Sequence, residues 1–95
     1  MRINQRDKDA IISAVKSKDP EAEIWLFGSR TDDSKRGGDI DIAILSSQIG
    51  RFDRMRIRRT ICDTLGEQKI DIIVSAKGEE AFFQLAKERG VKLHE

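Results

Sequence analysis

The chain has 95 residues, 38% of them apolar and 37% charged, so we expect one domain over residues 1–95 with a small core. Eighteen Lys and Arg residues nearly balance seventeen Asp and Glu residues, and the net charge of +1 gives no overall field to attract nucleic acid or an anionic membrane. No apolar run approaches the roughly 20 residues of a membrane span, and no signal-peptide pattern opens the chain. A cytoplasmic protein is expected.

Cysteine and histidine usage excludes two further classes. Cys62 is the one cysteine, and His94 is the one histidine. A structural zinc site and a Cys–His nucleophilic pair therefore lack the residues they need. Cys62 lies at helical spacing from other apolar residues and is predicted to be a buried small hydrophobe.

Apolar spacing predicts a helix over residues 7–18, which Asp19-Pro20 should end because the residue before proline disfavours helical geometry. A strand is expected over residues 23–27, where four consecutive apolar residues are typical of a strand covered on both faces. Gly28-Ser29 ends this strand, and the polar stretch 30–38 predicts a turn or one short helical turn.

A second strand is predicted over residues 39–45 from strict alternation. Ile40, Ile42 and Ile44 should point to one face, whereas Asp39, Asp41 and Ala43 point to the other. Asp39 and Asp41 therefore share a face.

A second helix is predicted over residues 52–65 and ends at Gly66. Arg54 and Arg58 fall on its apolar side, and either extend past it or reach a polar group across the fold. Its expected apolar side comprises Met55, Ile57, Ile61, Cys62 and Leu65, with Phe52 at the margin.

The remaining elements are a strand over residues 69–75 and a helix over residues 79–89 with Phe82, Leu85 and Ala86 inward. This order predicts an α/β fold in which a small sheet of at least three strands is flanked by helices. The sheet should be mixed, since its first two strands could run antiparallel.

Asp39, Asp41 and Asp71 lie in strands, where Asp is uncommon and an unpartnered carboxylate is costly to bury. If the strand of Asp71 adjoins that of Asp41, three like charges meet, and a divalent cation would relieve their repulsion. Oxygen ligands of this kind suit Mg²⁺ or Mn²⁺ better than zinc.

Gly28 and Ser29 supply the second half of the predicted site. A glycine at a strand end lets backbone approach a phosphate closely, and the following amides and the Ser29 hydroxyl can donate to its oxygens. Arg30, ahead of Lys35 and Arg36, is the first candidate to balance triphosphate charge.

Each feature alone also has a purely structural interpretation. Gly-Ser pairs are common in turns, Asp39 could simply start a strand, and Asp71 could pair with a nearby cation. The basic residues between positions 51 and 59 favour a solvated helix face over a nucleic-acid groove, because no aromatic platform interleaves them and Phe52 fits the core.

Taken together, Phe27-Gly28-Ser29-Arg30, then Gly38-Asp39-Ile40-Asp41-Ile42, then Asp71 on a later strand resemble the signature of the DNA polymerase β nucleotidyltransferase superfamily. In its short form the chain is similar to the minimal nucleotidyltransferases of prokaryotes. The resemblance runs from the first helix to at least Ser75. The stretch Thr31-Asp32-Asp33 departs from many members, which leaves the nucleotide preference open.

The resemblance implies attack of an acceptor hydroxyl on the α-phosphorus of a nucleoside triphosphate, with ATP expected, and release of pyrophosphate. Asp39, Asp41 and Asp71 would be the catalytic metal ligands, and Gly28, Ser29 and Arg30 would bind the nucleotide. Some minimal nucleotidyltransferases adenylylate a HEPN-type helical toxin and act as its antitoxin, so such a partner is hypothesised here, with a homo-oligomer as another source of acceptor surface.

Three alternatives compete with this interpretation. The first is a non-catalytic nucleotide- or partner-binding module of the same fold. The second is a phosphoacceptor receiver domain, although Asp39 and Asp41 alternate rather than adjoin. The third is a metal-dependent phosphatase or nuclease, which could use the same carboxylates but which Gly28-Ser29 does not favour.

Overall fold

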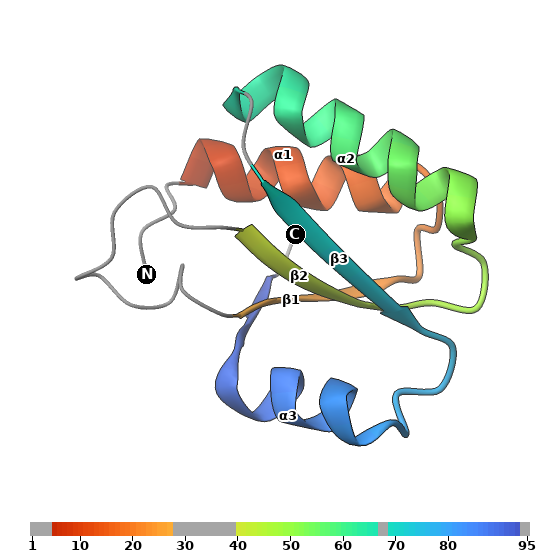
Figure 1. Cartoon of the computed structure of the whole chain (residues 1–95). Coiled ribbons are helices and arrows are strands. Elements are labelled where there is room, and N and C mark those ends of the chain that lie inside the picture. Colours follow the sequence, from red (N-terminus) through yellow and green to blue (C-terminus); the bar gives the residue numbers. More distant parts are fainter. Residues whose placement is uncertain (1–4, 28–39, 67–68, 94–95) are drawn as a thin grey trace.

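A computed structural model of the chain describes residues 5–27, 40–66 and 69–93. Within these residues, three helices pack on a four-stranded sheet with strand order β3-β2-β1-β4 (Figure 1). The elements in chain order are α1 (Gln5–Lys16), β1 (Glu23–Phe27), β2 (Ile40–Leu45), α2 (Arg51–Leu65), β3 (Ile70–Ser75), α3 (Ala81–Arg89) and β4 (Val91–Leu93).

The sheet is mixed, which confirms the predicted α/β fold class. β1 runs antiparallel to β2 and to β4, whereas β2 and β3 are parallel. A fully parallel doubly wound sheet, such as a receiver domain has, is thereby excluded.

The short strand β4 was not predicted, because its three residues follow Gly90 directly and are too few to show a period. A Cβ on Gly90 would lie 2.7 Å from the Leu26 carbonyl oxygen, so only glycine allows β4 to approach β1 this closely.

Helices α1 and α2 cover one face of the sheet, and α3 covers the other (Figure 1). The predicted alternation of β2 is confirmed, since Ile40, Ile42 and Ile44 are fully buried in the cluster under α1 and α2. Ala43 faces the smaller cluster under α3. There Trp25 and Phe83 pack edge to face, with ring centroids 5.7 Å apart and ring planes at 83°.

Helix α3 buries a different stripe from the predicted one. Ala86 is inward as expected, but its buried partner is Phe83, while Phe82 is 53% and Leu85 48% exposed. Because consecutive helical residues point about 100° apart, one helix cannot bury both Phe82 and Phe83 against the same strand pair. Phe83 is the one of the two that packs against Trp25.

Helix α2 also differs from expectation. Ile57, Ile61 and Cys62 are buried as predicted, but Met55 is 56% exposed and Phe52 is 75% exposed, so the placement of Phe52 in the core was wrong. Met55 precedes Ile57 by two positions and therefore points to nearly the opposite side of the helix.

The sequence left two placements open for Arg58, and the structure shows the second, a contact with a polar group across the fold. Its Nε donates a hydrogen bond of 3.1 Å to the Ile70 carbonyl of β3, so this side chain reaches a polar group across the fold. Among the residues described, no helix is long and apolar enough to cross a membrane.

A buried polar contact joins the turn before β1 to the loop after β2. The Ser46 hydroxyl donates to the Asp19 carboxylate at 2.5 Å and accepts hydrogen bonds from the Gln48 and Ile49 amides. Asp19 also accepts from the Glu21 amide at 2.9 Å, which shapes the chain into β1. This contact lies at the opposite end of the strands from the first residues of β2 and β3.

Candidate active site

Asp41 and Asp71 are brought together by the parallel pairing of β2 and β3. They are Cα partners in the register of these strands, so both side chains point to the α3 face of the sheet. Neighbouring strands lie about 4.8 Å apart, which is a spacing at which two carboxylates can hold one cation. Asp41 is half-buried and Asp71 is exposed, so the pair opens toward solvent.

The end of β1 lies at the same edge of the sheet. Phe27 is the Cα partner of Asp41 across the antiparallel pair and shares its face. The chain thus leaves the sheet at Phe27 and re-enters it at Ile40, which pairs with Ile70. Both attachment points of residues 28–39 therefore adjoin the carboxylate pair.

Four predicted site residues lie outside the described residues: Gly28, Ser29, Arg30 and Asp39. In the sequence, Gly28 directly follows Phe27 and Asp39 directly precedes Ile40. Among the described residues alone, no group of three potential metal-ligating side chains occurs. The predicted three-carboxylate set requires Asp39.

Helix α3 leaves the carboxylate pair uncovered. It packs mainly on β1 and β2, whereas β3 is the edge strand and its Asp71 is exposed. Ile73, two residues after Asp71 and on the same face, packs at the margin of the Trp25–Phe83 cluster. The result is an open acidic site bordered by an apolar surface. Phe27 and Ile73 were not named as site residues, although the alternation of their strands placed them on this face.

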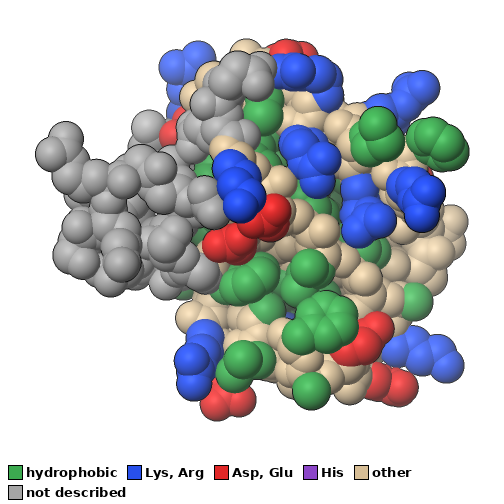
Figure 2. All heavy atoms as spheres, in the orientation of Figure 1, with side chains coloured by type: hydrophobic (Ala, Val, Ile, Leu, Met, Phe, Trp, Pro, Cys, Tyr) green, Lys and Arg blue, Asp and Glu red, His purple; other side chains and the backbone are tan. Residues whose placement is uncertain are grey.

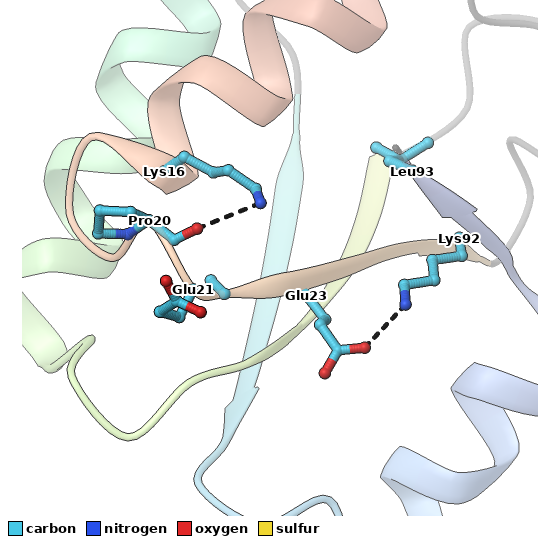
Figure 3. Close-up of a pocket in the computed structure, with 7 residues that line it drawn as sticks. Lys16, Pro20, Glu21, Glu23, Lys92 and Leu93 are labelled. Atoms are coloured by element: carbon cyan, nitrogen blue, oxygen red, sulfur yellow. Dashed lines mark hydrogen bonds and ion pairs between the residues drawn. The ribbon is translucent and has the colours of Figure 1, made fainter. Parts of the chain in front are cut away.

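A separate hollow of about 370 Å³ lies beside β4, lined in part by Lys16, Pro20 and Glu21 (Figure 3). Lys16 donates to the Pro20 carbonyl at 3.2 Å, and Lys92 forms an ion pair of 2.8 Å with Glu23. The Lys92 hydrogen bond holds the pKa of Glu23 below its usual value. Lys16, Glu23 and Lys92 are therefore each held by a structural partner.

Comparison with known proteins agrees with the geometry. The mixed sheet with a carboxylate pair on neighbouring strands is the arrangement expected for a nucleotidyltransferase fold. The family model described as polymerase beta, nucleotidyltransferase matches residues 9–95. This chain therefore belongs to the polymerase beta nucleotidyltransferase family, which confirms the resemblance predicted from its sequence. No curated protein matches the chain.

Membership supports a nucleotidyltransferase-type function, and hence transferase activity in general, because members of the family generally use nucleoside triphosphates and divalent metal ions. Membership of this family also favours a transferase over the phosphatase or nuclease alternative.

Proposed function

We propose that this chain is a magnesium-dependent nucleotidyltransferase that moves AMP from ATP onto an acceptor hydroxyl. The observation that carries the proposal is the pairing of Asp41 with Asp71 on one face of adjacent strands, in a chain of this family. In the proposed reaction the acceptor oxygen bonds to the α-phosphorus, the bond from that phosphorus to its bridging oxygen breaks, and pyrophosphate leaves. The hydroxyl proton passes to solvent.

The donor set fits magnesium. Carboxylate oxygens are the ligands that this ion prefers, and Asp41 and Asp71 present them from a rigid pair of strands, with Asp39 as the proposed third ligand. Bound Mg²⁺, or Mn²⁺ in its place, would supply Lewis-acid stabilisation of the charge that develops on the phosphate oxygens. The role of the protein is to hold Asp41 and Asp71 in register, with Asp71 exposed to solvent on the edge strand.

Gly28, Ser29 and Arg30 are proposed to bind the outer phosphates. Support comes from chain connectivity, because Gly28 follows Phe27, the register partner of Asp41. Backbone amides after a glycine can approach phosphate oxygens closely, and an arginine offers a bidentate donor.

The acceptor is proposed to be a hydroxyl on a HEPN-type helical partner, which would make this chain a protein adenylyltransferase and an antitoxin in the cytoplasm. Support comes from the resemblance of the chain to the minimal nucleotidyltransferases, some of which have such partners. The open face beside Asp71 leaves room for a macromolecular acceptor.

The test is a transfer assay with each α-labelled nucleoside triphosphate and Mg²⁺, with and without a purified HEPN-type protein from the same source. We expect label on that protein, or on the chain itself, with release of pyrophosphate. Asp41→Asn should abolish the transfer, whereas Asp63→Asn, on the outer side of α2, should retain it. If no triphosphate binds or reacts while the partner still binds tightly, the chain is a non-catalytic binding module instead.

A further inference from the structure

Strand β3 lies at an edge of the sheet, and its alternate residues direct their backbone amides and carbonyls away from β2. The Ile40 amide donates to the Lys69 carbonyl at 3.0 Å, and the Ser46 amide donates to the Ser75 carbonyl at 2.9 Å. Since alternate residues of a strand bond to the same neighbour, odd-numbered residues of β3 bond to β2. The backbone groups of Ile70, Ile72 and Val74 therefore point away from the sheet.

The usual protections of an edge strand are sparse here. The six residues of β3 include no proline, lysine or glycine, and four are β-branched aliphatic residues. The other edge strand, β4, has three residues only. Within the described part of the chain, the outward Ile70 carbonyl of β3 accepts a hydrogen bond from Arg58. The amides of Ile72 and Val74 thus offer a template for a further strand.

The two sides of this edge differ in chemistry. On the α2 side, Arg51 and Arg54 line a hollow of about 330 Å³ together with Val74, and Arg58 lies over Ile70. On the α3 side, hydrophobic side chains gather between β3 and α3, as Figure 2 shows. Ile73 is one of the partly buried residues on that side, and Phe82 on α3 is 53% exposed.

We propose that the β3 edge binds an extended polypeptide segment in which acidic and apolar residues alternate. Successive side chains of a strand point to opposite faces, so the acidic set would meet Arg54 and Arg58 and the apolar set would meet Ile73 and Phe82. Backbone bonds to Ile72 and Val74 would supply affinity, and the two rows of side chains would supply selectivity. This inference stands independently of the proposed transfer activity.

Charge decides against two other occupants. In a two-fold dimer through β3, the arginines beside the edge would face their own copies, and like charges in contact repel. A nucleic acid would meet the carboxylate of Asp71 on the α3 side of the edge, and this charge repels phosphate. An acidic and apolar strand satisfies both sides.

The test is a titration of the full chain with a capped synthetic peptide of about ten residues that alternates glutamate and valine. A peptide that alternates lysine and valine is the matched control. We expect binding of the glutamate peptide alone, with slower hydrogen exchange at the Ile72 and Val74 amides. Arg54→Glu should weaken this binding at least tenfold, whereas Arg56→Glu, elsewhere on α2, should change it less than twofold.

Three results would overturn the proposal: equal binding of the lysine peptide, absence of binding, or binding without slower exchange at Ile72 and Val74. Analytical sedimentation of the chain without peptide shows whether a second copy of the chain occupies the edge. If the chain self-associates and the same two amides are already slow, the occupant of the edge is a second copy and the peptide proposal is wrong.

Discussion

The two faces of the sheet are built for different tasks. Under α1 and α2, the even-numbered isoleucines of β2 and β3 join residues of both helices in one continuous buried cluster. Under α3 the buried cluster consists of Trp25, Ala43, Phe83 and Ala86, and the carboxylates of Asp41 and Asp71 lie beyond it. One face therefore supplies most of the stability, which leaves the other free to present charged groups that would otherwise be costly.

The largest expected effect is a loss of stability from the α1/α2 face. Ile42→Ala removes a fully buried side chain, so we expect unfolding free energy to fall by about 2–5 kcal/mol. Met55→Ala removes a side chain that is 56% exposed and should cost less than about 0.5 kcal/mol. Urea denaturation followed by circular dichroism measures both. Equal losses would show that burial does not distinguish the two positions.

On the α3 face, we expect a substitution to lower activity strongly and stability little. Asp71→Asn should lower the transfer rate at least about 100-fold, equivalent to roughly 3 kcal/mol, because it removes one proposed metal ligand. The same exposed substitution should change stability by less than about 0.5 kcal/mol. Pyrophosphate release and thermal unfolding are to be measured on the same preparation. A variant that unfolds without losing activity per folded molecule would reverse the assignment.

A smaller effect is expected at the far end of the strands. Ser46→Ala leaves the buried Asp19 carboxylate without its 2.5 Å donor, and we expect a cost of about 1–3 kcal/mol. Ser47→Ala, at the exposed neighbouring position, is the control and should be nearly neutral. Nucleotide binding should persist in both variants, since neither residue adjoins Asp41. Loss of nucleotide binding in folded Ser46→Ala would contradict this, because it would show that the Ser46–Asp19 contact affects the carboxylate site.

The smallest effect concerns the ion pair of β1 with β4. The Lys92 hydrogen bond lowers the pKa of Glu23 from 4.5, so the pair stabilises the fold above pH 4.5 and this contribution is lost as pH falls through the lowered pKa. Both side chains are more than 40% exposed, which limits the contribution to less than about 1 kcal/mol. Unfolding of Glu23→Gln should therefore differ from the parent at pH 7 and converge with it at acid pH. A difference that grows in acid would contradict this.

Periodicity predicted most of the sheet. The strict alternation of residues 39–45 assigned Ile42 to the core and Asp41 to the opposite face, and both assignments are confirmed. The sequence alone did not predict that the strand of Asp71 pairs with the strand of Asp41, because this pairing depends on how α2 crosses the sheet. Gly28, Ser29, Arg30 and Asp39 stay predictions.

The errors fell on the helices. Phe52, Phe82 and Leu85 were expected at or near the core and are exposed, because a helix that packs on one side alone buries a narrow stripe. Apolar residues outside that stripe carry the same local signal as those within it. The exposure of Phe52 also removes one reason given against a binding role for the basic helix α2.

The central claim is that Asp41 and Asp71 hold the metal on which nucleotide binding depends. Isothermal titration calorimetry of ATP into the chain, with Mg²⁺ and then with a chelator, tests it most directly. We predict binding that requires Mg²⁺, is lost in Asp41→Asn and in Asp71→Asn, and is retained in Asp63→Asn. Binding of ATP that is indifferent to the ion and to both substitutions would contradict the account.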